Sequence, residues 1–443
     1  MKSTFTGILV LILIAFSSYG QENAAIQKQE KQAIIDKAIV LLKENYVFPN
    51  RVANIEKQIK EKLTMGGYDS LADMESFLGS LNADLEHYGN DHHLDISYGP
   101  KRVKQIIADT KNEQEGKEQK ITDEWLQQMR YENFRLRKLE RLDGNIGYFN
   151  FLNFTPLAVS KQSISSAMNF LLYSNAIIID LRENGGGSAE TMNFLLSYFL
   201  ADSIQISELR YRKNNNVVKS YTMNDSTINK IPGNIPVYIL VSNRTSSAAE
   251  GFAYTLQQYK RAVIIGEQTK GEGNPGKLFV INDDLYIMIP TAEAINPVSK
   301  KSIDGVGVIP DITVSKNKAL TKSLLEAYSS LAAGTSNDEL RLLYQWQIPL
   351  LENELDPEPL TNNIISSLVG NYEGNRKIMY ENGSVFYINS AGDKEQLQYM
   401  GNGIFQNTQK SWLRLVMPFT DKPVSEFEWI WEDGGTPQKV KRV

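Results

Sequence analysis

Hydroxyl-bearing residues open the segment Thr245-Ser-Ser-Ala-Ala-Glu250, which directly follows the apolar run VYILVS at 237–242. This pattern predicts a buried strand that turns into a helix running from Ser247 to Tyr259. A serine at such a corner lies beside the free N–H groups of the first helical turn, which can stabilise a negatively charged oxygen. Ser247 is therefore a candidate nucleophile. Ser247 and Glu250 also match the capping-box pattern S-x-x-E, a structural role compatible with the catalytic one.

Three consecutive glycines follow a second apolar run, AIIIDL at 176–181, in the segment Asn184-Gly-Gly-Gly187. A continuous apolar run is typical of a strand buried on both faces, and α/β sheets bind ligands at the carboxyl ends of their strands. Glycine allows backbone N–H groups to approach a reacting carbonyl closely. The alternative is an ordinary tight turn between a strand and a helix.

All three histidines of the chain fall close together, at His87, His92 and His93, and Asp91 is adjacent to the last two. Histidine is the side chain whose ordinary pKa lies near neutrality, so a histidine base must come from this cluster. Histidine and aspartate are also zinc ligands, although the H-E-x-x-H spacing is absent. These residues alone leave three interpretations open: a catalytic base, a metal site and a solvated loop.

Asp304 lies in the glycine-bounded segment Ser302-Ile-Asp-Gly-Val-Gly307. A carboxylate in such a turn can orient a histidine. It is equally suited to the structural role that aspartate plays before glycine in many turns. The choice between the two depends on where the rest of the chain brings this turn.

These residues must be positioned by the surrounding strands and helices. The pattern of those elements predicts an α/β protein with a mainly parallel sheet. Strands alternate with helices of 10–15 residues through the core at 144–315. Its predicted strands are 146–151, 176–181, 237–242, 262–265 and 285–289.

Other predicted domains flank this core. Apolar residues at helical spacing predict an N-terminal helical domain at 25–100. We expect a charged helical connector at 101–143, with a polar loop at 111–120 and a helix over 125–142. A helical linker at 316–360 and a small antiparallel β-domain at 361–443 complete the chain.

The N-terminus predicts export. Lys2, an apolar run at 8–16 and the small residues Ser18 and Gly20 are typical of a signal peptide, 1–20, cleaved near Gly20. The run is too short to span a bilayer comfortably, and an uncleaved anchor is the alternative. We expect a periplasmic or secreted bacterial protein with no integral membrane segment after removal of the signal.

The composition narrows the chemistry further. The chain has 443 residues, no cysteine and a formal net charge of −5. The absence of cysteine excludes a thiol nucleophile and a thiolate metal site. Mild acidity without a clustered basic face argues against nucleic acid as a partner.

Together these motifs resemble the C-terminal-processing serine peptidase family, in the branch that includes interphotoreceptor retinoid-binding protein and the tricorn protease core. The matching segments occur in family order over about residues 30–315. They are Glu44-Asn-Tyr-Val-Phe-Pro49, Asp91-His-His-Leu94, Gly144-Asn-Ile-Gly-Tyr148, Ile179-Asp-Leu-Arg-Glu-Asn-Gly-Gly-Gly187, Thr245-Ser-Ser-Ala-Ala-Glu250, Lys260-Arg-Ala-Val-Ile-Ile-Gly-Glu267 and Gly305-Val-Gly-Val-Ile-Pro-Asp311.

The resemblance implies a crotonase-like core and assigns roles within it. Ser247 matches the family nucleophile, and His93 matches the histidine of the D-x-H-L pattern. Asp304 falls where the branch usually has glutamate, one methylene longer. The resemblance further implies an oxyanion hole made by the amide of Ala248 and an amide from the glycine segment. The contributors to that second amide are Gly186 or Gly187.

Two departures from the wider family stand out. In its Ser–Lys branch a lysine lies 25 residues after the serine, and here that position is Glu272. No segment resembles the PDZ module with which many members grip substrate C-termini.

The resemblance therefore predicts an exported serine peptidase that acts on a peptide or unfolded protein through an acyl-enzyme, without a metal or a cofactor. Two alternatives stay open. One is a non-catalytic protein on the same scaffold that binds an apolar ligand or peptide. The other is a structural scaffold whose β-domain binds a partner or a glycan. The oligomeric state does not follow from the sequence.

Overall fold

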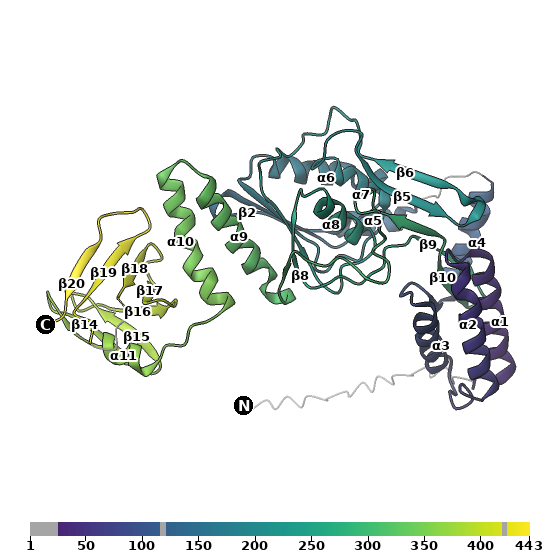
Figure 1. Ribbon diagram of the computed structural model, residues 1–443, viewed down its shortest axis with the longest axis horizontal. Coiled ribbons are helices and arrows are strands. Elements are labelled where there is room, and N and C mark those ends of the chain that lie inside the picture. The colour runs from purple at the N-terminus through teal and green to yellow at the C-terminus, as the bar shows by residue number, and fades with distance from the viewer. Residues whose placement is uncertain (1–24, 116–120, 419–422) are drawn as a thin grey trace, which may run out of the picture.

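The computed structural model of the chain describes residues 25–115, 121–418 and 423–443. The predicted signal peptide lies outside the described residues. The described residues form an elongated molecule, with a helical domain at one end, an α/β core in the middle and a β-domain at the other end (Figure 1). In the described part of the chain, no helix combines the length and apolar character needed to cross a membrane.

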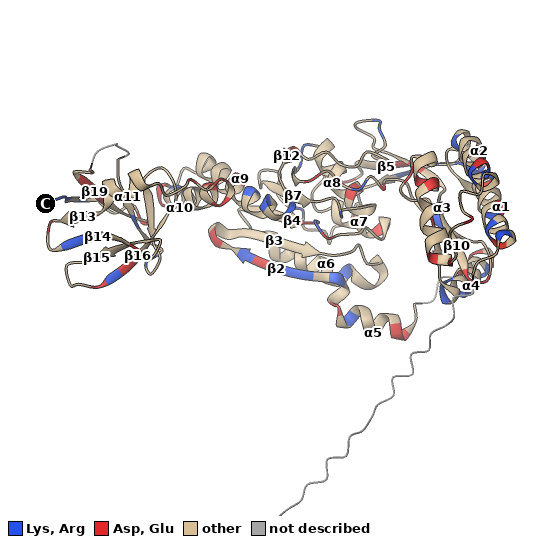
Figure 2. Ribbon diagram, turned by 90° about the horizontal axis from the view of Figure 1, so that it is seen from below, with Lys and Arg blue, Asp and Glu red and all other residues tan. Residues whose placement is uncertain are grey.

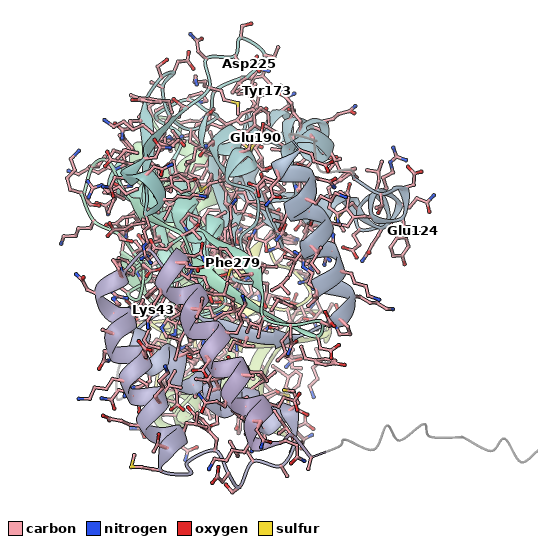
Figure 3. All side chains as sticks on the ribbon, turned by 90° about the vertical axis from the view of Figure 1, so that its right-hand side faces the viewer. Lys43, Glu124, Tyr173, Glu190, Asp225 and Phe279 are labelled. Carbon is pink, nitrogen blue, oxygen red and sulfur yellow. The ribbon has the colours of Figure 1, made fainter. Side chains whose placement is uncertain are left out.

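The N-terminal domain packs three helices against a small antiparallel sheet. The helices are α1 (Lys28–Asn45), α2 (Pro49–Thr64) and α3 (Met74–Gly89). The sheet has the order β1 (Asp95–Tyr98), β10 (Leu285–Pro290) and β9 (Gly276–Val280). Apolar residues of the three helices and of β10 share one core. Figure 3 shows Phe279 of β9 where this domain meets the rest of the molecule.

Our assignment of 285–289 to the core sheet was therefore wrong. The strand forms, but its alternating buried residues Leu285, Ile287 and Ile289 cover the N-terminal helices instead. A segment from late in the sequence thus completes the helical domain and ties it to the core.

The central sheet contains six strands in the order β12-β8-β7-β4-β3-β2. All neighbours are parallel except β2, which pairs antiparallel with β3. This confirms the predicted α/β class with a mainly parallel sheet. The strands are β2 (Leu136–Leu142), β3 (Ile146–Phe151), β4 (Ala176–Asp180), β7 (Val237–Val241), β8 (Val263–Gly266) and β12 (Ile312–Thr313).

Helices cover both faces of the central sheet, which is why β4 and β7 are buried along their whole length. Three helices lie on the face that carries the candidate nucleophile: α6 (Leu157–Leu171), α7 (Ala189–Leu196) and α8 (Ala248–Gln258). Two helices pack on the other face: α9 (Ala319–Gly334) and α10 (Asp338–Leu355). A further antiparallel sheet has the order β11 (Ala292–Ile295), β5 (Gln205–Tyr211) and β6 (Val217–Tyr221).

The charged connector differs from its prediction in two places. Helix α4 (Pro100–Gln114) continues into the expected loop, whose residues 116–120 lie outside the described part. The helix predicted over 125–142 is wrong: α5 (Asp123–Tyr131) ends early, a 3₁₀ turn follows at Asn133–Arg135, and residues 136–142 form β2. Because β2 is an edge strand, its charged side chains can face solvent. Figure 2 shows the charged positions of β2 in blue and red.

The C-terminal part confirms the predicted antiparallel β-domain. After α11 (Asn362–Leu368), eight strands follow in sequence order and pair with their neighbours. They are β13 (Gly370–Tyr372), β14 (Arg376–Glu381), β15 (Ser384–Ile388), β16 (Lys394–Tyr399), β17 (Ile404–Asn407), β18 (Leu413–Val416), β19 (Glu426–Trp431) and β20 (Gln438–Lys441). A bridge between Tyr372 and Arg442 joins the first strand to the end of the last and closes a barrel.

Candidate active site

Ser247 lies at the corner between β7 and α8, as the sequence predicts. It is the residue before the first helical position, and its φ of 54° and ψ of −122° place it in a region that non-glycine residues rarely adopt. Strained serines at strand-to-helix turns are how several hydrolases expose a nucleophile. The side chain is half-buried, so solvent or a substrate can reach the hydroxyl.

Glu250 fixes the backbone of this corner. Its side chain is fully buried, and its Oε2 accepts the N–H groups of Ser247 and Glu272, both at 2.8 Å. Its Oε1 accepts the Thr269 hydroxyl at 2.5 Å and the Gly271 N–H at 2.7 Å. Burial raises the pKa of Glu250, and these donors oppose that rise. The capping residue therefore also attaches the serine corner to the loop at 269–272.

The glycine segment after β4 packs directly against Ser247. A Cβ added to Gly186 would lie 2.7 Å from the Ser247 Cβ and 3.0 Å from the Ala248 nitrogen. Only glycine fits there, and its φ of 93° also favours glycine. The Ala248 nitrogen, at the first position of α8, thus lies next to this glycine.

The two candidate glycine amides differ in availability. The Gly186 N–H donates to Asn184 Oδ1 at 2.9 Å, and the fully buried Asn184 side chain donates in turn to the Phe151 carbonyl. In contrast, the Gly187 N–H finds no acceptor within the described residues, and Gly187 is exposed. Gly187 is therefore the better partner for Ala248. The sequence did not reveal the role of Asn184, whose only signal was its place before the glycines.

His93 lies between two carboxylates from different parts of the chain. Its Nδ1 lies 3.5 Å from Asp91 Oδ1 and 3.7 Å from Asp304 Oδ1. Both distances exceed the usual hydrogen-bond range, and within the described residues this buried nitrogen has no hydrogen-bond partner. The structure therefore brings Asp304 to His93, as the resemblance implies, and adds Asp91, which we had not assigned a role.

Electrostatics at this cluster favour a protonated imidazole. Burial alone would lower the pKa of His93, but the carboxylates of Asp91, Asp304 and Glu272 outweigh it and raise the pKa above its ordinary value. Burial, followed by the charge of Asp91, raises the pKa of Asp304 to about 6. The negative charge of Asp91 thus disfavours a second negative charge on Asp304.

Glu272 connects the serine corner to the histidine. Its N–H shares Glu250 Oε2 with the Ser247 N–H, while its own carboxylate raises the pKa of His93. Its side chain also forms an ion pair with Lys270. No hydrogen bond or ion pair joins Ser247 directly to His93 in the part of the chain that the structure describes.

The other two histidines stay outside the site. His92 Nδ1 lies 2.6 Å from Glu86 Oε1 on an exposed surface. His87 contacts the ring of Tyr88 with a centroid distance of 5.0 Å. The loop interpretation fits His92, whereas His87 is exposed in the last turn of α3. Of the three histidines, His93 is the one that lies among buried acidic groups.

One group of side chains has the composition of a metal site. Asp91, His93 and Asp304 each offer one ligand atom, and these atoms lie within 4.8 Å of one another. Two carboxylates and an imidazole suit a divalent ion such as zinc. The same arrangement also suits an imidazole base with orienting carboxylates, so the donor set by itself does not decide between them.

Two sequence models match this chain. Residues 145–314 match Peptidase family S41, and residues 24–134 match the N-terminal domain of peptidase S41 in eukaryotic IRBP. The chain is 28% identical over 205 residues to a carboxy-terminal-processing protease of Bartonella bacilliformis, covering 45% of this chain and 44% of that protein. It is 30% identical over 172 residues to a chloroplastic carboxyl-terminal-processing peptidase of Arabidopsis thaliana, covering 38% of this chain and 32% of that one. The chain thus spans less than half the length of these curated relatives.

Solved structures show more distant similarity. A lipoprotein from Streptococcus agalactiae is 17% identical, with a TM-score of 0.44, and the match covers 68% of this chain and 96% of that one. The tricorn protease is 12% identical, with a TM-score of 0.41, and the match covers 73% of this chain and 37% of that one.

Proposed function

This chain belongs to peptidase family S41, and from that membership and the geometry of its site we propose that it is a serine peptidase that hydrolyses peptide bonds through an acyl-enzyme. The observation that carries the proposal is that His93 of the N-terminal domain lies 3.7 Å from Asp304 of the core. The two residues lie next to the loop at 269–272, which the Glu250 carboxylate connects to the Ser247 corner. These are the three residue types that an imidazole-activated serine requires.

In the proposed reaction, the Ser247 hydroxyl attacks the carbonyl carbon of the scissile bond and His93 accepts the hydroxyl proton. His93 then gives this proton to the leaving amine as the C–N bond breaks, which leaves an ester on Ser247. A water molecule attacks the ester with His93 again acting as base, and Ser247 regains its proton. His93 Nδ1 lies farther than a hydrogen bond from Asp91 and Asp304, and catalytic hydrogen bonds of this kind commonly tighten when substrate binds.

The amides of Ala248 and Gly187 would hold the negative oxygen of the tetrahedral intermediates. Both N–H groups are free of acceptors within the described residues, and the Ala248 amide also benefits from the positive end of α8. Gly186 keeps the space beside them open because it has no side chain.

Glu272 cannot replace the lysine of the Ser–Lys branch as a base. A carboxylate cannot accept the proton of a serine hydroxyl as effectively as a neutral amine, and here it pairs with Lys270. Its supporting role is to raise the pKa of His93 through its negative charge. The general base of the proposed mechanism is therefore His93.

We further propose that the protein is exported and that its substrates are peptides or unfolded proteins. The apolar run after Lys2 supports export, and the family's proteolytic relatives support the substrate class. N-terminal sequencing of protein from the periplasmic and culture fractions tests the first point, with cleavage near Gly20 expected.

The central test compares Ser247→Ala with Ser246→Ala. A peptide library should be cleaved by the wild type and by S246A, whose lost hydroxyl donates only to the Gly185 carbonyl. S247A should lose both turnover and labelling by a fluorophosphonate, while circular dichroism stays unchanged. Turnover retained in S247A would contradict the assignment. An inactive wild type whose tryptophans are quenched by apolar ligands would favour the binding protein instead.

A further inference from the structure

Asp91 is an ionisable group at the imidazole that the mechanism above does not use. Its side chain is fully buried. Its Oδ1 accepts the backbone N–H of His93 at 2.9 Å and lies 3.5 Å from His93 Nδ1. Asp304 lies slightly farther from the same nitrogen, at 3.7 Å. A small tilt of the ring would therefore bring Nδ1–H into hydrogen-bond range of either carboxylate.

The N-terminal helical domain holds Asp91 firmly in place. Its Oδ2 accepts the Tyr46 hydroxyl at 2.8 Å. Arg51 Nη1 lies 3.5 Å from that hydroxyl and donates to the Gly89 carbonyl at 3.0 Å, at the end of α3. Burial and Asp91 raise the pKa of Tyr46, so the phenol stays a neutral donor. Both oxygens of Asp91 are thus fixed by donors, and Oδ1 still faces the imidazole.

Asp304 is held less completely. Its Oδ1, the oxygen nearest His93, also accepts the Asn274 N–H at 3.2 Å. It comes from a loop of the core, whereas Asp91 and His93 share one short turn after α3. Where the related branch carries a glutamate, this chain has the shorter aspartate, which reaches less far toward the imidazole. Asp91 supplies a second carboxylate at a similar distance from the same nitrogen.

We propose that Asp91 is a second positioning carboxylate for His93, which shares with Asp304 the task of orienting the imidazole and stabilising its protonated form. The inference rests on the proposed function, because it assigns a part in the same reaction. The charged groups that face His93 are Asp91, Asp304 and Glu272, and the charge of Arg51 on α2 acts on Asp304. Either aspartate alone then supports a large share of the activity.

The kinetic test is a double-mutant cycle of Asp91→Asn and Asp304→Asn. Asparagine keeps an acceptor for the His93 N–H and a polar contact with Tyr46, so the fold is retained while the charge is lost. We expect each single variant to lose no more than about tenfold in kcat and the double variant about 10⁴-fold, the loss seen when a triad carboxylate is neutralised. The double loss should exceed the product of the single losses, with KM little changed. D304N losing about 10⁴-fold by itself, with D91N within about twofold of wild type, would overturn the proposal.

A second readout separates positioning from a merely structural role. The chain has three histidines, so ¹⁵N-histidine NMR resolves His93 once His87→Gln and His92→Gln assign the others. D91N should lower the pKa of His93, and Tyr46→Phe, which keeps the Asp91 charge, should move it much less. An unchanged His93 titration in D91N, together with lower stability, would reduce Asp91 to a structural residue. This titration needs no turnover, so it remains decisive even if S247A disproves the peptidase.

Discussion

Glu250 Oε2 accepts the backbone N–H of Ser247 at 2.8 Å, so the proposed nucleophile is fixed by a carboxylate from the helix that it begins. The same buried carboxylate collects three more donors from the loop at 269–272. This loop also carries Glu272, whose charge acts on His93. One side chain therefore sets both the strained backbone of the serine and the loop that faces the histidine.

Glu250→Gln should damage both stability and activity. An amide keeps one acceptor oxygen but turns an NH₂ toward two N–H or O–H donors, which leaves buried groups unpaired. We expect a loss of about 1–3 kcal/mol in the free energy of unfolding and a fall of at least about tenfold in kcat/KM. Urea unfolding and peptide hydrolysis measure these effects.

Glu190→Gln is the matched control for this substitution. Glu190 lies in the first turn of α7, is exposed, and sits at the surface in Figure 3. Neutralising it should change stability by no more than about 0.5 kcal/mol. Equal losses of stability and activity in E250Q and E190Q would contradict the prediction. They would show that the loss comes from removing a negative charge near a helix start and not from disrupting the buried hydrogen bonds of Glu250.

Gly186→Ala should lower activity because the added methyl group crowds the Ser247 corner. The new methyl would lie 2.7 Å from the Ser247 Cβ and 2.8 Å from the Ser246 carbonyl oxygen, at a φ of 93° that disfavours alanine. It would also sit beside the Ala248 amide. We expect kcat to fall by about 10²-fold or more, the scale of losing one oxyanion donor.

Gly185→Ala provides the comparison, because a Cβ there meets no atom within 4 Å. We expect activity within about threefold of wild type, since most surface substitutions are mild. Assays of initial rates on one peptide substrate suffice for both variants. If G186A retains full kcat, the oxyanion is not held beside Ala248.

Some strands of the fold could be predicted because the apolar character of a single segment determines whether it is buried. The apolar runs of β4 and β7 were long enough to require burial on both faces, and the core sheet supplies it. The segment that became β2 misled because Leu136, Leu139 and Leu142 recur at a spacing that suits a helix. Pairing with β3 overrode that spacing, and Leu139 ended exposed.

The candidate site was likewise predictable from the local sequence only in part. Ser247 and the glycine segment 185–187 could be predicted as site residues, because each lies between a predicted strand and a predicted helix. By contrast, the partnership of His93 with Asp304 joins residues that are far apart in sequence, and only the family resemblance suggested it. The contacts of Asp91 with Tyr46, and of Asn184 with Phe151, depend on packing between distant elements, which no local spacing records.

Replacing Glu272 should move the acid limb of the pH–rate profile. His93 must be neutral to act as base, and the carboxylates raise its pKa, so kcat/KM falls on acidification at a higher pH than an ordinary histidine would give. Glu272→Gln removes one of these charges and should shift the limb to lower pH. Lys270→Gln removes the cation paired with Glu272 and should shift the limb to higher pH. Shifts of the same sign in both variants would show that the charge of Glu272 does not reach His93.

Trp346 of α10 should determine whether the β-barrel unfolds together with the core. Its Nε1 donates to the Ser411 carbonyl at 3.1 Å, and the Arg414 guanidinium stacks 3.8 Å from the ring centroid. Burial lowers the pKa of Arg414 to about 10, so the ring shields a desolvated cation. Trp346→Ala exposes that cation and leaves a cavity, with an expected loss of about 3–5 kcal/mol.

Because the barrel has an apolar core of its own, this loss should split one calorimetric transition into two rather than unfold the whole chain. Trp412→Ala is the control, since Trp412 belongs to the same barrel but is 47% exposed. Peptide hydrolysis should stay within about twofold of wild type in both variants, because the contacts of Trp346 reach the barrel and not the serine corner. A single transition at an unchanged temperature in W346A would mean that other contacts of α10 hold the barrel in place.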